Sequence, residues 1–444
     1  MFIIYFIIAL LSIIAFKRHK DSYFIVLIGA IVSGGFGFLP SPAPIKISDI
    51  TLLVIISCFI LRKNLLSVKN DKIGKMILGL LCYYAIITFF TIFLHRESFI
   101  SSIMVLRLEL YLLLYFILKK MNRQEVFNAF AVLRIGTIIS GIFFYLQLVG
   151  VTGFLNYNAS EEISMTDGFA RLTNIPLLCI VMFFYSLLYE KGKLRIFYTI
   201  FFGGMIIVAQ SRGLFLSSII SVLLFLLFKR QLKKSLKVLF SFSLIGLLAY
   251  PIISYRFSDS GSTTSVASDV KFAFHTIVDS NPNLYDNSVI YSSGTFTFRL
   301  LMAKERIEYL SQSPLYLLFG VGSLHGNSSS MNQFHFNIGT EIIKDGHIEM
   351  QQIDTNDISF ITHLVKFGFV YFFIYIALII LIVKRLLCRN DCLSNVCLLL
   401  VLCKILQCLG SDTFSGIDNM FFVLLITAVD FNNYHKKNRN EIQL

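Results

Sequence analysis

The strongest constraint on the fold is a long series of apolar runs that are separated by clusters of lysine and arginine. The chain is 56% hydrophobic and 15% charged, whereas ordinary globular domains are about a quarter charged. This balance argues against a soluble enzyme and excludes a disordered chain, because disorder requires few apolar residues. A bilayer core of ~30 Å needs roughly 20 apolar residues for each helix that crosses it. We therefore expect an all-α polytopic membrane protein.

The apolar runs predict about 12–14 transmembrane helices. The predicted spans lie near residues 2–16, 23–39, 50–61, 76–94, 99–118, 126–148, 176–189, 196–210, 214–228, 238–254, 359–383, 394–409 and 414–430. The basic clusters between them are expected to be cytoplasmic, because positive charge is retained on that side. This assignment gives an external N-terminus and a cytoplasmic C-terminus. It also explains the net charge of +13 without a nucleic acid, which we do not expect as a partner.

Four regions follow from this layout. Residues 1–254 form a transmembrane bundle of ten spans with a small external loop at 149–175. Residues 255–357 form a large external loop, residues 358–430 form the C-terminal spans, and residues 431–444 form a cytoplasmic tail. None of the eight cysteines falls in a predicted external loop, and the histidines have no ligand spacing. We expect no disulfide, no metal site and no cofactor.

The large loop is far longer than a connection between two helices requires. A disordered insertion is one interpretation, but the sequence from Phe296 onward has a helical pattern that Pro314 ends, followed by a Gly320–Gly322 turn. Arg299 and Arg306 lie on or beside the apolar stripe of this amphipathic helix. They either belong to a functional site or extend to lipid headgroups.

Two further arginines occupy constrained external positions. Arg171 precedes the span that begins at Pro176, in the run GFARLTNIP, and Arg212 lies in a tight turn, in the run AQSRGLFLS. Exposure to solvent is sufficient to explain a charged residue at either position. Alternatively, Arg171, Arg212 and Arg299 converge on one anion, since guanidinium groups bind phosphates bidentately. Beside a membrane, a lipid pyrophosphate is the obvious target.

Other charges lie in or next to the spans. Arg107, Glu109, Arg134 and Lys404 fall within apolar runs, where charged residues usually face a partner or a cavity. A structural ion pair such as Glu109 with Arg134 is as good an interpretation as a substrate role. Asp357 begins the run DISFITHLVKFG where the large loop re-enters the membrane. It is either a general base or the cap of the following helix.

Taken together, these motifs resemble those of the O-antigen polymerase and O-antigen ligase superfamily. GFARLTNIP is similar to an arginine-containing external loop, and AQSRGLFLS to a Ser-Arg turn between spans. Arg299 followed by PLYLLFGVG is similar to an R…P-L-x-G-x-G stretch, and DISFITHLVKFG to the frame of the H-N-x-Y-L…G motif. The motifs cover roughly residues 165–370. The ligases have histidine where this chain has Asp357, which favours a polymerase, and the Asn-Pro-Asn of relatives is reduced to Asn174-Ile175-Pro176.

The resemblance implies metal-independent glycosyl transfer on the periplasmic face of the inner membrane. Both substrates would be undecaprenyl-pyrophosphate-linked oligosaccharides. The protein partners that it implies are a chain-length regulator and a flippase. Site residues would include Arg212, Arg299 and the base Asp357, with Arg171, Arg306 and Asn174 binding substrate.

Three alternatives stay open. A ligase to lipid A–core would use the same arginines. A lipid-linked-sugar flippase would be expected to have short loops and internal pseudosymmetry. A polyprenyl-phosphate-sugar transferase usually has an acidic pair in its first external loop, where this chain has only Asp49.

Overall fold

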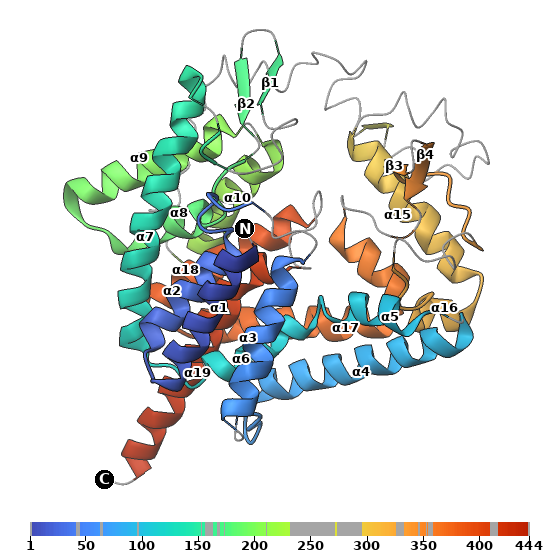
Figure 1. Cartoon of the computed structure of the whole chain (residues 1–444), viewed down its shortest axis with the longest axis horizontal. Helices are drawn as coiled ribbons and strands as arrows, with labels where there is room; N and C mark the ends of the chain where they lie inside the picture. Colours follow the sequence, from blue (N-terminus) through green and yellow to red (C-terminus); the bar gives the residue numbers. More distant parts are fainter. Residues whose placement is uncertain are drawn as a thin grey trace.

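The computed structural model describes most of the chain and is predominantly helical (Figure 1). The described residues are 2–40, 45–62, 65–95, 97–151, 153–155, 163–166, 169–172, 174–209, 211–230, 271–272, 295–325, 333–344, 347–351, 353, 358–408 and 416–442. The predicted span at 238–254 and the predicted base Asp357 lie outside them.

The described part of residues 2–149 contains seven α-helices and two short 3-10 helices. They are α1 (Phe2–Lys17), α2 (Asp21–Val32), α3 (Ile47–Leu61), α4 (Lys72–Leu94), α5 (Phe99–Leu106), η1 (Leu110–Leu113), α6 (Leu114–Leu118), α7 (Arg123–Leu146) and η2 (Gln147–Val149). The later elements are β1 (Ile163–Thr166), β2 (Phe169–Leu172), α8 (Cys179–Tyr189), α9 (Gly192–Val208), α10 (Arg212–Phe228), α15 (Thr295–Ser311), α16 (Pro314–Phe319), β3 (Thr340–Lys344), β4 (His347–Gln351), α17 (Ser359–Leu387), α18 (Cys392–Gln407) and α19 (Ile417–Ile442).

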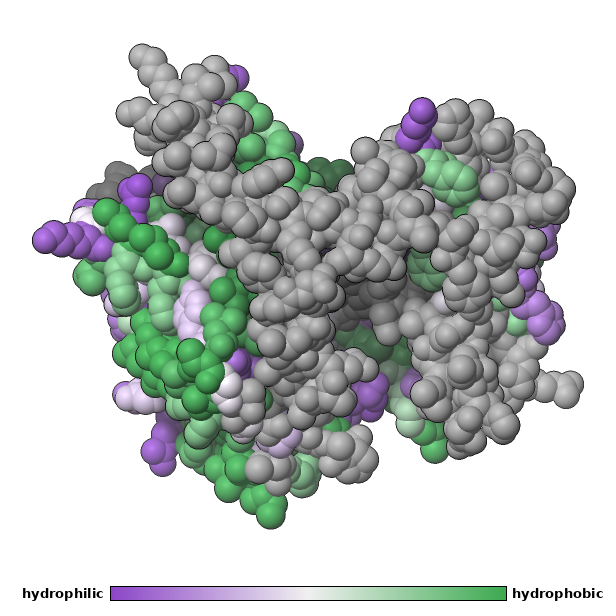
Figure 2. Space-filling model, turned by 90° about the horizontal axis from the view of Figure 1, so that it is seen from above, coloured by the Kyte–Doolittle hydropathy of each residue, from purple (hydrophilic) through white to green (hydrophobic). Residues whose placement is uncertain are grey.

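The described helices are those of an all-α membrane protein. Three of them, Lys72–Leu94, Arg123–Val149 and Phe360–Leu387, are long and apolar enough to cross a bilayer. A fourth span is formed if α5 and the segment Leu110–Leu118 are counted together. Seven further apolar helices are shorter. Apolar side chains cover much of one flank of the molecule (Figure 2). The exposed apolar residues include Ile135 of α7 and Ile200 of α9, which are 58% and 68% exposed.

Three elements differ from the sequence-based prediction. The predicted helix at 23–39 ends at Val32, because Gly34, Gly35 and Gly37 adopt positive φ values that end a right-handed helix. The predicted span 99–118 is broken into α5, η1 and α6 with a bend of 50°. In the predicted cytoplasmic tail, α19 continues without interruption to Ile442.

The two loops contain short antiparallel hairpins that the apolar pattern does not reveal. β1 pairs with β2 in the small loop, where Ser164 lies opposite Arg171. β3 pairs with β4 in the large loop, from Thr340 opposite Gln351 to Lys344 opposite His347. Both hairpins lie at the end of the molecule opposite the C-terminus (Figure 1).

The predicted amphipathic helix of the large loop is present. It is α15, which ends at Ser311, shortly before Pro314. A second helix, α16, begins at Pro314 and was not predicted. Leu310 of α15 and Val321 after α16 share a small apolar core with Leu364 and Val365 of α17. This described part of the large loop therefore packs on the C-terminal helices and is not a disordered insertion.

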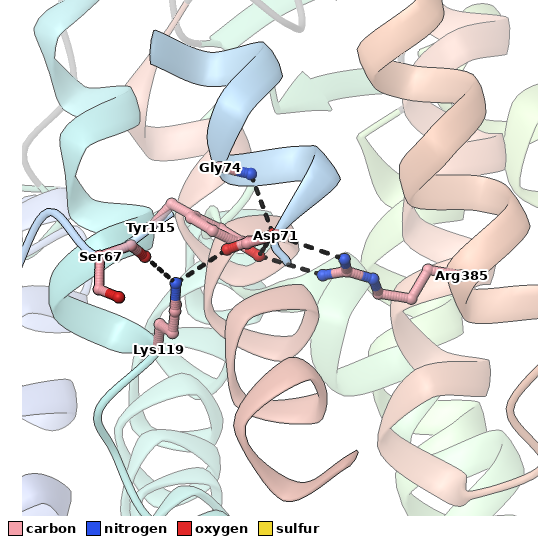
Figure 3. A network of polar contacts seen from close by, with 6 residues as sticks. All are labelled: Ser67, Asp71, Gly74, Tyr115, Lys119 and Arg385. Atoms are coloured by element: carbon pink, nitrogen blue, oxygen red, sulfur yellow. Dashed lines mark hydrogen bonds and ion pairs between the residues drawn. The ribbon is translucent and has the colours of Figure 1, made fainter. Parts of the chain in front are cut away.

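The buried carboxylate of Asp71 connects α4, α6 and α17 through hydrogen bonds and ion pairs (Figure 3). Asp71 is fully buried and caps α4 by accepting a hydrogen bond from the Gly74 amide, 3.1 Å away. Tyr115 of α6 donates to Asp71 over 3.1 Å, and the Lys119 ammonium donates over 3.0 Å. Arg385 of α17 lies 3.7 Å from the same carboxylate and donates to the Tyr115 hydroxyl. We call these four side chains (Asp71, Tyr115, Lys119 and Arg385) the Asp71 cluster.

Candidate functional site at two helix breaks

Helix α17 is broken at Gly368, which has a φ of 71° and a ψ of −176°. A break deprives the carbonyls of the preceding turn of their intrahelical donors, and an unsatisfied carbonyl in lipid costs several kcal/mol. Residues from other segments supply donors here. The amides of Val321 and Gly322 donate to the carbonyls of Val365 and Lys366, over 2.8 and 3.0 Å. The Tyr83 hydroxyl of α4 donates to the Phe367 carbonyl over 2.8 Å.

Two glycines allow the chain segments at this break to approach backbone to backbone. A Cβ on Gly320 would lie 2.5 Å from the Lys366 carbonyl oxygen, and one on Gly368 would lie 2.3 Å from the Leu318 oxygen. Both glycines also have a positive φ, which side chains with a Cβ rarely adopt. The turn after α16 continues to α4, where the Ser323 amide donates to the Thr91 hydroxyl over 2.8 Å. The break is therefore a built junction of α4, α16 and α17.

The second break separates α5 from η1, and Glu109 lies in it. The Glu109 side chain is only 2% exposed. Arg107 points elsewhere and forms an ion pair of 2.6 Å with Asp49 of α3. Non-helical backbone at membrane depth is tolerated only when it is buried in protein or lines a cavity, and buried ionisable residues there usually mark functional sites.

His363 of α17 connects the two breaks. Its Nδ1 lies 3.8 Å from Glu109 Oε1, within ion-pair range and longer than a hydrogen bond. Its ring stacks on Tyr371, with the centroids 5.6 Å apart, and on Tyr375, with the centroids 6.0 Å apart. A carboxylate beside an imidazole that packs against aromatic rings is an arrangement suited to accepting and stabilising a proton.

The alternative ion pair between Glu109 and Arg134 is wrong. Arg134 of α7 pairs with Glu190, which follows α8, and lies over the Tyr198 ring. Lys404 of α18 donates to Asn419 of α19 over 2.7 Å. These contacts hold helices of the bundle together and lie on elements other than the two broken segments.

Among the predicted arginines of the large loop, Arg299 and Arg306 have different environments. Arg299 is partly buried on α15. Arg306 is fully buried, forms a 2.6 Å ion pair with Glu305 and lies 4.1 Å from the Phe336 ring centre. Glu305 also accepts hydrogen bonds from the amides of Asn337 and Ile338. Burial lowers the pKa of the Arg306 guanidinium to about 10, so it remains charged at neutral pH.

Asn174 is also enclosed by the chain. Its side chain is 3% exposed and its amide donates to the Gln147 oxygen over 2.8 Å, which joins the end of α7 to the approach to α8. Arg171 lies in β2 and Arg212 is the first residue of α10, after Ser211, which caps that helix. The side chains of Arg171 and Arg212 lie outside the described part, so their convergence with Arg299 stays a prediction.

The sequence singled out Glu109 and the run containing His363, but not their pairing. The sequence signal for Glu109 was a carboxylate inside an apolar run. The signal for His363 was a histidine in a second apolar run, five residues before Gly368. Tyr83 had no signal. Within the described ranges, no group of three or more His, Cys, Asp or Glu side chains is arranged to bind a metal ion.

No protein-family model matches the sequence, and no curated protein matches it.

Proposed function

We propose that the protein polymerises lipid-linked oligosaccharide repeat units at the outer face of the inner membrane. In this reaction the growing glycan leaves undecaprenyl pyrophosphate and joins the next undecaprenyl-pyrophosphate-linked repeat, as in the assembly of an O-antigen or similar surface polysaccharide. The proposal extends to the finer topology, with 12–14 spans, a periplasmic large loop, a periplasmic N-terminus and a cytoplasmic C-terminus.

The observation that carries this proposal is the contact between two motif-bearing segments far apart in the sequence. The Gly320–Gly322 turn, which resembles the P-L-x-G-x-G stretch, donates its amides to the carbonyls just before Gly368. Arg299 lies on α15, which packs against both α16 and α17. The resemblance was drawn from separate pieces of sequence, and their meeting at one junction supports a common site.

The chemistry requires positive charge where the pyrophosphate leaves. Charge develops on the phosphate oxygens as the glycosidic bond breaks, and fixed cations stabilise it in the transition state. Arg171, Arg212 and Arg299 are the proposed cations, and Asp357 remains the base that the motif frame suggests. Arg306 and Asn174 act indirectly in this proposal, because their described contacts are with the chain itself.

Replacing Arg299 by alanine is expected to reduce polymer formation by about 100-fold or more, the usual effect of removing one transition-state charge partner. The gene is deleted in its host and surface polysaccharide is resolved on a gel after complementation. Lys304→Ala is the matched control, because Lys304 is a cation on the same helix and its ion pair with the half-exposed Glu308 is 3.8 Å long. Lys304→Ala should restore the ladder, whereas Arg299→Ala should insert normally and fail to restore it.

The deletion itself separates the candidate functions. Loss of long chains with lipid A–core carrying a single repeat supports the polymerase. Polymer that accumulates on undecaprenyl pyrophosphate without reaching lipid A–core identifies a ligase. An unchanged ladder contradicts both and favours a transporter.

A further inference from the structure

We propose that α16 lies within the hydrocarbon core of the bilayer, with Leu315, Leu318 and Phe319 against lipid acyl chains. This helix belongs to the segment predicted as the large external loop, so part of that loop would enter the membrane. Its location there follows from its contacts with α4 and α17, two helices long and apolar enough to cross a bilayer, and does not depend on the proposed reaction.

The surface of α16 is apolar and is not covered by the rest of the chain. None of its six residues is buried. Leu315 is 67% exposed, and Leu318 and Phe319 are also exposed. A contiguous apolar surface is unfavourable in water, whereas lipid chains are as apolar as a leucine side chain and cover it without that cost.

The position of Gly368 along α17 gives the depth of α16. The Leu318 carbonyl of α16 lies against Gly368, where a Cβ would be 2.3 Å from its oxygen. Gly368 lies 16 residues before Lys384, an exposed cation in the last turn of α17. Basic residues at the end of a span lie near the edge of the bilayer, and 16 residues of helix are about 24 Å long. Because the hydrocarbon core is ~30 Å thick, the contact between α16 and α17 lies inside it.

Helix α4 gives the same depth independently. In the turn after α16, the Ser323 amide donates to the Thr91 hydroxyl over 2.8 Å. Thr91 lies 16 residues after Lys75, an exposed cation near the start of α4, which again corresponds to about 24 Å. The basic ends of α4 and α17 lie on the same side of the membrane, since Arg385 is 3.7 Å from Asp71. Both helices therefore place α16 at one depth.

The backbone around α16 is compatible with this depth. Every amide in hydrocarbon needs a partner within the protein, because lipid supplies none. The helix begins with Pro314, which has no amide to satisfy. After the helix, the five amides from Gly320 to Leu324 all donate to backbone carbonyls or to the Thr91 hydroxyl.

The lipid contact can be measured directly, because the chain has no tryptophan. Leu315→Trp and Phe319→Trp each introduce a single tryptophan at an exposed position, where it should not disturb packing. Each full-length variant is reconstituted into phosphatidylcholine vesicles with and without bromine on the acyl chains, since bromine quenches a tryptophan that touches it. Iodide dissolved in the buffer is the second quencher and reports contact with water.

Two further variants are the matched controls. Phe373→Trp reports lipid contact, because Phe373 is 63% exposed on α17 beyond the break. Asn337→Trp reports contact with water, because Asn337 is an exposed residue of the same loop. The Asn337 amide donates to Glu305, which is nine residues before the start of α16. Unfolding curves that match the wild type show that a variant is folded.

If α16 lies in hydrocarbon, Leu315→Trp and Phe319→Trp lose as large a fraction of their fluorescence to brominated lipid as Phe373→Trp does. Iodide should quench both less than it quenches Asn337→Trp. Quenching by iodide at the level of Asn337→Trp, without quenching by bromine, places α16 in water and overturns the proposal. Tryptophans that neither quencher reaches show that a protein surface, such as a second copy of this chain, covers α16, and this result overturns it too. None of these readouts requires activity, so failure of the proposed function is seen separately in the deletion experiment.

Discussion

Replacing Asp71 by alanine is expected to lower the free energy of unfolding by about 3–5 kcal/mol, the effect of removing one partner from a buried ion pair. The Lys119 ammonium would lose this carboxylate and keep its hydrogen bond to the Ser67 carbonyl, 2.5 Å away. The Tyr115 hydroxyl and Arg385 would lose the carboxylate that they share (Figure 3). The N-terminus of α4 would also lose its capping oxygen.

This change is measured on purified protein in detergent micelles. Because the chain has no tryptophan, unfolding is followed with a thiol-reactive dye that labels buried cysteines such as Cys58 and Cys397, after the exposed thiols have been blocked. Asp49→Ala is the control, since Asp49 also pairs with an arginine but its side chain is 25% exposed. Asp49→Ala should lower the free energy of unfolding far less than Asp71→Ala does, because solvent-exposed ion pairs contribute little to stability. Equal stability of the two variants would contradict a structural role for the Asp71 cluster.

Replacing Gly368 by alanine is expected to separate the large loop from α17. A positive φ costs a residue with a Cβ about 1–3 kcal/mol, and the new Cβ would lie 2.3 Å from the Leu318 oxygen. The segment from Gly320 to Gly322 would have to move away, which removes the amides that satisfy Val365 and Lys366. Gly320→Ala should act in the same way from the other side, since its Cβ would meet the Lys366 backbone.

Limited proteolysis of the protein in native membranes measures this separation, because an undocked loop is cut faster between α15 and α17. Gly79→Ala is the matched control. Gly79 lies inside α4 with no atom within 4 Å of its would-be Cβ, so alanine should leave proteolysis unchanged and helix stability equal or slightly higher. If Gly368→Ala is cut at the wild-type rate and is as stable as the wild type, the junction tolerates a Cβ at this position. That result would contradict the close backbone packing.

Much of the helical layout was predictable from the periodicity and apolarity of local segments. The runs 76–94 and 359–383 appear within α4 and α17, and the run 126–148 appears within α7 and the adjoining η2. The pattern after Phe296 appears as α15. These predictions succeeded because a run of apolar residues, a capping residue and a proline act over one or two helical turns. The hairpins β1–β2 and β3–β4 were not predicted, because each strand is only four or five residues long. The alternation of apolar and polar residues in β1 and β4 is too short to distinguish a strand from an irregular loop.

The breaks at Glu109 and Gly368 could not be seen in the same way. Each lies inside a predominantly apolar run, and a single glycine or carboxylate there is compatible with a continuous helix. What makes the break at Gly368 possible is a set of donors from distant segments, Val321, Gly322 and Tyr83. No local pattern contains that information.

The sequence by itself therefore determined that the chain is an apolar helical membrane protein, and it placed Arg299, Glu109 and His363 among the residues to consider. The tertiary structure alone decided which of these charges meet. It paired Glu109 with His363 and Arg134 with Glu190, and it enclosed Arg306 against Glu305. The physical reason is that a charge inside an apolar run must find a partner, but the partner depends on which helices pack together and where they break.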